Sequence, residues 1–186
     1  MEIGYFLSCE EHTPVELIRG AQLAEQAGFT KAWISDHFHP WNDAEGQSPF
    51  VWAVLGGIAQ ATGLHLTTAV TCPTFRIHPV VVAQAAATAA CMFEGRFSLG
   101  VGTGEALNEH VTGLPWPRVA VRQAMLEEAV GIIRRLWEGG QVRSTATTST
   151  STTPASTRFR PPRRTSSSPA SAPSPRSWPR ASGTVT

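Results

Sequence analysis

The chain has 186 residues, with 15 basic and 14 acidic side chains and three cysteines. These numbers exclude a strongly charged protein and a disulfide framework, and the lack of an apolar run of about 18 residues excludes a transmembrane helix. The N-terminus lacks a charged segment followed by an apolar one, so we expect a cytoplasmic chain without a secretory signal. The scattered cysteines predict no metal site, and each is expected to be a small buried side chain.

Residues 143–186 differ in composition from the rest of the chain. These 44 residues contain 11 Ser, 10 Thr, 7 Pro and 7 Arg, but no Asp, Glu, Leu, Ile, Met or Lys. Without those 7 Arg, residues 1–142 carry 8 basic and 14 acidic side chains, a net charge of −6. Because a segment of this composition cannot bury a core, we predict a folded domain over 1–142 and a disordered tail over 143–186.

Strands and helices alternate along the predicted domain. Residues 3–7 form an apolar run typical of a buried strand, and Thr13, Pro14 and Glu16 then form a capping box that begins a helix ending at Gly28. Further strands are predicted at 30–34, 64–71 and 97–102, and further helices at 49–62, 79–92 and 117–138. Successive strand–helix units with nearly all-apolar strands predict a parallel sheet with crossover helices.

Polar side chains gather directly after three of these strands, in the segments 35–41, 71–76 and 103–108. In a (β/α)8 (TIM) barrel, the carboxyl ends of the strands form the catalytic face. Four units are half of such a barrel. We therefore predict an α/β fold that comprises the N-terminal half of a TIM barrel, followed by the disordered tail.

The same three segments carry residues suited to chemistry. In Ser35-Asp36-His37-Phe38-His39-Pro40-Trp41 a carboxylate adjoins an imidazole, which suits proton transfer near neutral pH, and the indole offers a flat apolar wall. The segment 100–108 places glycines and Glu105 before a helix, where backbone N–H groups bind anions. In 71–79, Arg76 is a candidate for holding an anionic ligand. Each segment, taken alone, also fits an ordinary surface loop or connection.

Taken together, four segments resemble the luciferase-like family that uses the deazaflavin coenzyme F420, and most closely its branch of glucose-6-phosphate dehydrogenases. They are SDHFHPW at 35–41, TCPTFR at 71–76, HPVVVAQAAAT at 78–88 and GVGTGEALNE at 100–109. The resemblance spans essentially all of 1–142. It implies a TIM barrel with F420 across the carboxyl ends of the strands, hydride transfer between an alcohol or sugar-phosphate carbon and the deazaflavin, and homodimers among intact relatives.

The resemblance also implies roles for individual residues. His37 would remove the proton of the substrate hydroxyl, Glu105 would handle the proton on the deazaflavin ring, and Trp41 would wall the substrate side. A non-prolyl cis peptide would back the ring at Ala69–Val70. The other residues expected to contact the coenzyme are Asp36, Thr103, Gly104 and Asn108.

Two departures from the family pattern leave the substrate open. His39 stands where the glucose-6-phosphate enzymes tend to have glutamine, and residues 42–52 differ from theirs. In that branch the residues that bind the sugar phosphate lie in the second half of the barrel, which this chain lacks.

The tail is explained better by a change of reading frame than by a genuine extension. When the third base of each codon is read with the next two, and the wobble positions are free, residues 144–148 permit Phe-Asp-Gly-Asp-His. That string resembles the segment that comes after the long helix in the family. We therefore interpret 143–186 as out-of-frame translation, and we expect this truncated chain to be inactive in turnover.

Two other functions remain open. One is an FMN-dependent luciferase-like monooxygenase on the same barrel, against which the SDHFHPW and GTGEALNE segments argue. The other is nucleic-acid binding through the Arg-rich tail, since clustered basic residues attract polyanions. The favoured interpretation has a small-molecule alcohol or sugar phosphate as substrate, and neither a nucleic acid nor a membrane as partner.

Overall fold

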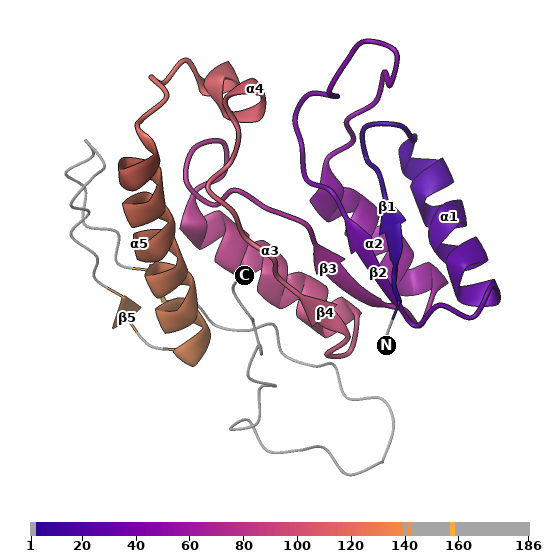
Figure 1. Cartoon of the computed structure of the whole chain (residues 1–186). Helices are drawn as coiled ribbons and strands as arrows, with labels where there is room; N and C mark the ends of the chain where they lie inside the picture. The colour runs from indigo at the N-terminus through magenta and orange to yellow at the C-terminus, as the bar shows by residue number, and fades with distance from the viewer. Residues whose placement is uncertain (1–2, 140, 143–156, 159–186) are drawn as a thin grey trace.

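The computed structural model describes residues 3–139, 141–142 and 157–158 (Figure 1). Four strands form one sheet in the order β1-β2-β3-β4, and every neighbouring pair is parallel. They are β1 (Tyr5–Leu7), β2 (Lys31–Ile34), β3 (His65–Thr68) and β4 (Phe97–Ser98). The helices are α1 (Pro14–Gln26), α2 (Val51–Ala61), α3 (Pro79–Met92), α4 (Ala106–Glu109), the 3-10 helix η1 (His110–Thr112) and α5 (Val119–Glu138). The predicted α/β fold with four parallel units is confirmed.

Local sequence signals explain where the helices begin. The Thr13 hydroxyl accepts a hydrogen bond from the Glu16 backbone N–H, and the Glu16 carboxylate accepts one from the Thr13 backbone N–H at 2.9 Å. This capping box satisfies two donors that a helix leaves unpaired, as predicted. Helix α3 begins at Pro79, after His78, whose Nδ1 accepts a hydrogen bond from the Val80 backbone N–H.

Strand β4 is shorter than the run predicted at 97–102. Beyond Ser98 the Thr68 side chain takes the place of backbone pairing between β3 and β4. Its hydroxyl donates a hydrogen bond to the Gly100 carbonyl at 2.9 Å and accepts one from the Gly100 N–H at 3.1 Å. A Cβ at position 100 would lie 2.1 Å from the Thr68 carbonyl oxygen, so only glycine allows this approach. Parallel pairing resumes once, between Thr71 and Val101.

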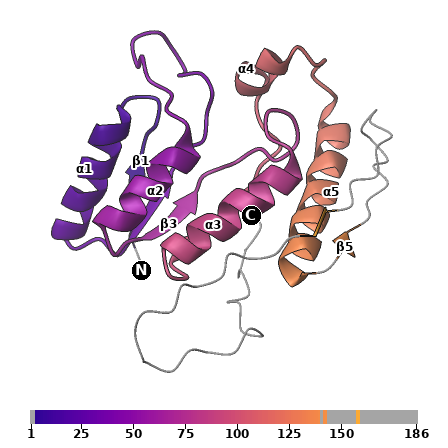
Figure 2. The same cartoon turned by 180° about the vertical axis from the view of Figure 1, so that it is seen from behind.

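The helices cover one face of the sheet. Side chains on that face are buried, among them Leu7, Ala32, Ile34, Leu66 and Phe97. In Figure 2, the view from behind, α1, α2 and α3 lie in front of the strands. Helix α5 packs on α3 through Val82, Ala83, Ile133 and Leu136. This arrangement leaves the carboxyl ends of the strands free to carry the loops of the candidate site.

Two expectations need correction. Cys9 and Cys72 are buried as predicted, but Cys91, near the end of α3, is exposed because it faces away from the sheet. In the tail, β6 (Thr157–Arg158) pairs antiparallel with β5 (Gln141–Val142), so these two tail residues form a strand and not the coil expected there. The rest of 143–186, with the predicted disorder, lies outside the described residues. Among the helices of the described part, none is long and apolar enough to cross a membrane.

Candidate active site

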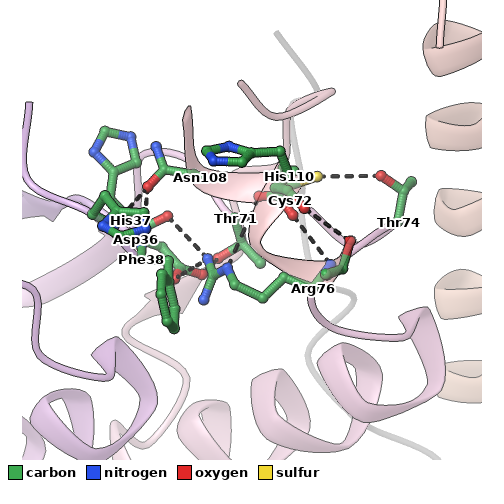
Figure 3. Close-up of polar contacts among 12 residues, drawn as sticks. Asp36, His37, Phe38, Thr71, Cys72, Thr74, Arg76, Asn108 and His110 are labelled. Carbon is green, nitrogen blue, oxygen red and sulfur yellow. Dashed lines mark hydrogen bonds and ion pairs between the residues drawn. The ribbon is translucent and has the colours of Figure 1, made fainter. Parts of the chain in front are cut away.

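The loops that follow β2, β3 and β4 meet at the carboxyl edge of the sheet, where the sequence predicts the site (Figure 3). Asp36 and His37 come directly after β2, Thr71 and Arg76 follow β3, and Asn108 lies in α4, beyond β4. Hydrogen bonds join these three segments although they are separated by more than 30 residues in the chain.

The His37 imidazole is held by a carboxylate that the sequence analysis missed. Glu10 lies three residues after β1, is 3% exposed, and its Oε1 is 2.7 Å from His37 Nδ1. Its other oxygen accepts hydrogen bonds from the Ser8 hydroxyl at 2.9 Å and the Ser35 hydroxyl at 2.8 Å. The position of Glu10 at the carboxyl end of a strand was the available signal. When the proton of the neutral ring is on Nδ1, beside the Glu10 carboxylate, the Nε2 atom of His37 is left as the proton acceptor.

The charges of this pair support each other. Burial is the largest single influence on Glu10 and opposes its ionisation, yet the hydrogen bonds from His37, Ser35 and Ser8 outweigh it and lower its pKa to about 2. The hydrogen bond to Glu10 raises the pKa of His37, against the opposing effect of burial, and the nearby Glu105 and Asp36 raise it further. His37 is therefore a stronger base than an ordinary histidine.

Trp41 and Glu105 lie near His37. The Trp41 ring meets the imidazole edge to face, with ring centroids 5.2 Å apart, and its side chain is 55% exposed. Glu105 is an exposed residue at the N-cap of α4 and makes no capping hydrogen bond with its side chain. The predicted trio of base, acid and aromatic wall is thus gathered on one side of the molecule.

A buried cluster of charges lies behind His37. Asp36 is 4% exposed, and its carboxylate accepts a hydrogen bond from the Thr71 hydroxyl at 2.8 Å and another from Arg76 Nη2 at 3.0 Å. Arg76 Nε lies 4.0 Å from the Glu109 carboxylate, which also accepts a hydrogen bond from the Arg76 backbone N–H at 3.1 Å. The guanidinium is 11% exposed and faces inward, so the hypothesis that Arg76 holds an anionic ligand is wrong.

Asn108 ties the loop after β4 to the loop after β2. Its Oδ1 accepts hydrogen bonds from the backbone N–H groups of Phe38 at 2.8 Å and His39 at 2.9 Å. The residue is 2% exposed, and its Nδ2 is a buried donor that lacks a protein partner in the described part of the chain. His110 stacks on His39 with ring centroids 6.3 Å apart, which adds a second contact between the same loops.

A cis peptide bond after β3 and two glycines after β4 shape the backbone beside these loops. The peptide bond Ala69–Val70 is cis, as predicted, and the Val70 side chain is 44% exposed. A Cβ at Gly102 would lie 2.6 Å from Val70 Cγ2, and Gly104 has a φ of 76°, a conformation that favours glycine. Thr103 lies between these two glycines and is partly buried. The described His, Cys, Asp and Glu side chains form no group that could hold a metal ion.

The sequence of this chain is similar to those of known proteins. A family model described as luciferase-like monooxygenase matches residues 1–182. The F420-dependent glucose-6-phosphate dehydrogenase of Mycolicibacterium smegmatis is 47% identical over 145 residues, which cover 76% of this chain and 43% of that protein. The F420-dependent glucose-6-phosphate dehydrogenase 1 of Rhodococcus jostii has the same identity and coverage. This chain therefore spans less than half the length of these relatives.

Solved structures agree with the sequence matches. An F420-dependent secondary alcohol dehydrogenase in complex with an F420-acetone adduct is 42% identical with a TM-score of 0.75, and the match covers 78% of this chain and 45% of that one. The coenzyme F420-dependent tetrahydromethanopterin reductase of Methanopyrus kandleri is 25% identical with a TM-score of 0.65, over 78% of this chain and 42% of that one. The predicted fold class, the N-terminal half of a parallel (β/α)8 barrel, is confirmed.

Proposed function

The chain belongs to the luciferase-like monooxygenase family, and from its site we propose an F420-dependent oxidoreductase that transfers hydride between an alcohol carbon and the deazaflavin. The observation that carries the proposal is the buried Glu10–His37 pair, with 2.7 Å between the carboxylate and Nδ1. An alcohol can lose hydride from carbon only if its hydroxyl proton also leaves, and a histidine held in this way is suited to accept that proton. A small alcohol or a sugar phosphate is the proposed substrate class.

In this proposal His37 moves one proton. During oxidation the O–H bond of the substrate breaks, its proton goes to Nε2 of His37, and the resulting imidazolium is stabilised by the Glu10 carboxylate. During carbonyl reduction the same proton returns to the new hydroxyl. Because the raised pKa of His37 strengthens it as a base, the pairing favours proton removal from a weakly acidic alcohol.

The residues present fit a flat coenzyme ring. Exposed Val70 and the bare Gly102 form a surface without large side chains, and the buried Asn108 Nδ2 is a donor without a protein partner in the described structure. F420, when bound, would supply a deazaflavin ring that accepts or returns a hydride. Val70 and Gly102 would support that ring, Thr103, Gly104 and Asn108 would contact it, and Glu105 would hold the proton exchanged at it. Asp36 would act mainly by anchoring His37, because both of its carboxylate oxygens are engaged.

Trp41 completes the proposed substrate side. Its exposed indole lies edge to face with the His37 imidazole and offers an apolar wall beside that ring. The proposed compartment is the cytoplasm, in keeping with three free cysteines. Intact relatives are proposed to be homodimers.

The first test is coenzyme binding by the purified full chain. We expect the fluorescence of F420 to change on titration with the chain, with FMN binding at least tenfold more weakly. Gly102→Ala should weaken F420 binding, and Gly131→Ala in α5, where a Cβ meets no atom within 4 Å, is the matched control. Preferential binding of FMN would favour the monooxygenase alternative, and steep salt-dependent binding of arbitrary DNA would favour the nucleic-acid alternative.

The second test concerns turnover and the reading frame. We propose that residues 143–186 arise from a frame change and that the chain as it stands does not turn over an alcohol. The nucleotide sequence around codons 136–146 should show one base lost or gained, with the other frame open well beyond the tail. A frame-corrected protein should reduce F420 with an alcohol, and its His37→Ala variant should not. Equal activity of the original and corrected chains would contradict the proposal.

A further inference from the structure

In the described part of the chain, one face of the sheet has no helix over it. The strand register aligns Phe6 with Trp33, Trp33 with Thr67, and Thr67 with Ser98, so these four side chains share the face opposite the helices. Phe6 is 52% exposed and Trp33 is 36% exposed, whereas Leu7 and Ile34, one residue further along, are 2% and 0% exposed. Figure 1 looks onto this open face and Figure 2 onto the covered one. Exposed aromatic side chains on a sheet face mark it as an interaction surface.

Both edges of the same sheet are also unpaired in the described part of the chain. β1 pairs with β2 alone and β4 with β3 alone. The next strand in sequence, β5, does not extend this sheet, because it pairs with β6 in a sheet of its own. Unpaired backbone groups on an edge strand are a template for another strand. Because β1 and β4 run in the same direction, each edge is able to receive the other in parallel.

We propose that the open face and both edges bind a second copy of this chain, so that two half-barrels close into one eight-stranded parallel barrel. β4 of each copy would pair with β1 of the other around a two-fold axis. Eight strands enclose an interior that side chains just fill, and four strands from each of two copies supply that number. The length of the chain also fits two copies per barrel, because its match covers 45% of the solved secondary alcohol dehydrogenase chain, or about half of it.

The chemistry of the chain favours a second copy over its own tail as the occupant. Residues 143–186 contain no Leu, Ile or Met, so they cannot supply the apolar strands that would cover Phe6 and Trp33. The Trp33 ring lies against Gly4, the residue before β1, where a Cβ would come within 2.0 Å of it. This contact holds the indole against its own sheet, while the side chain stays 36% exposed.

Pairing in this way would bring two copies of the candidate site to one rim. Parallel strands from both copies would end at the same side of the barrel, so the His37–Glu10 pair of each copy would face a shared opening. The second copy would therefore supply the wall that is missing opposite each set of loops. Closure of the barrel by a second copy does not require the coenzyme.

The deciding measurement is the mass of the purified full chain in solution, by light scattering after gel filtration. We expect a single species of twice the 20.0 kDa chain mass at micromolar concentration. Phe6→Asp should convert it to the monomer, while Val15→Asp, at a 75%-exposed position of α1 away from the open face, should not. A monomeric wild type, an open series of larger oligomers, or a Phe6→Asp variant that stays dimeric would overturn the proposal.

Cysteine crosslinking decides the question if Phe6→Asp does not fold. Within one copy, β1 and β4 are separated by two strands, or about 14 Å, which is beyond the Cα separation of about 4.4–6.8 Å that a disulfide spans. The shear of eight residues in such a barrel, shared by two equal junctions, offsets β4 from β1 of the other copy by about four residues. In a Cys91→Ser background, Phe6→Cys chains mixed with chains that carry either Glu94→Cys or Gly102→Cys, four residues to either side of Ser98, should form a crosslinked pair at one of these two positions, and no chain alone should do so. Equal crosslinking of each chain alone would contradict the two-fold barrel. Because neither measurement uses F420, their failure leaves the proposed function untouched.

Discussion

Replacing Arg76 by methionine tests whether the buried charge cluster holds the site together. The change keeps an unbranched side chain of similar length and removes the guanidinium that lies 3.0 Å from Asp36 and 4.0 Å from Glu109. The two carboxylates stay buried, with side chains 1% and 2% exposed, so water cannot replace the lost cation. The Thr71 hydroxyl remains as a donor to Asp36 at 2.8 Å.

The expected loss of stability is large for a single substitution. Removing one partner of a buried ion pair costs about 3–5 kcal/mol, because an uncompensated charge remains inside. Since the Thr71 hydrogen bond survives, we expect the lower end, about 3 kcal/mol, against a typical total of about 5–15 kcal/mol. With a urea m-value of about 1–3 kcal/mol/M, the unfolding midpoint should fall by about 1–3 M.

The assay is urea unfolding of the full chain, followed by tryptophan fluorescence and circular dichroism. Arg134→Met is the matched control, since Arg134 is an exposed residue of α5 and its loss should change stability by no more than about 0.5 kcal/mol. The double variant Asp36→Asn with Arg76→Met should lose less stability than the sum of the two single variants, because neither an unpaired Asp36 carboxylate nor an unpaired Arg76 guanidinium then stays buried. An Arg76→Met midpoint within error of the control would refute the structural role of the cluster.

Three further predictions concern single residues. Glu10→Gln should lower the pKa of His37, because it removes the carboxylate that raises it, and an NMR titration of the ring that matches the wild type would contradict the pairing. Gly102→Ala should weaken F420 binding at least tenfold, or about 1.4 kcal/mol, since its Cβ would lie 2.6 Å from Val70 Cγ2; unchanged affinity would remove Gly102 from the cradle. Burial raises the pKa of Glu109 above its ordinary value of 4.5, so between the ordinary and the raised pKa the folded state binds more protons than the unfolded state. The free energy of unfolding should therefore fall as the pH rises from the ordinary pKa through the raised one. Urea midpoints should show this slope in the wild type and a flatter profile in Glu109→Gln.

Much of the fold was predictable because the local signals agree with the tertiary structure. The capping box at Thr13, the proline at the start of α3 and the apolar strand runs each indicate an element that the structure contains. The length of β4 was not predictable, because the apolar run at 97–102 does not reveal that a Thr68 hydroxyl takes the place of backbone pairing. That contact joins residues 32 apart in the chain.

The candidate site was predictable where its residues are adjacent in sequence and not where they meet across loops. Asp36, His37 and Trp41 share one segment, and family resemblance also indicated the cis bond at Ala69–Val70. Arg76 was misassigned because its partners, Asp36 and Glu109, are 40 and 33 residues away. Glu10 was missed for the same reason: its role depends on a contact with His37 that only the pairing of β1 with β2 creates.

The described half of the barrel holds its own candidate residues in place. His37 is fixed by Glu10 from the first loop, by Arg76 and Thr71 through Asp36 from the third, and by Asn108 from the fourth. None of these contacts requires a strand beyond β4. Proton handling at His37 therefore depends on residues within 3–139, whereas an enclosed substrate pocket depends on whatever covers the open face of Phe6 and Trp33. For this reason we expect the response of the His37 pKa to Glu10→Gln to be measurable in the isolated chain even if alcohol turnover is not.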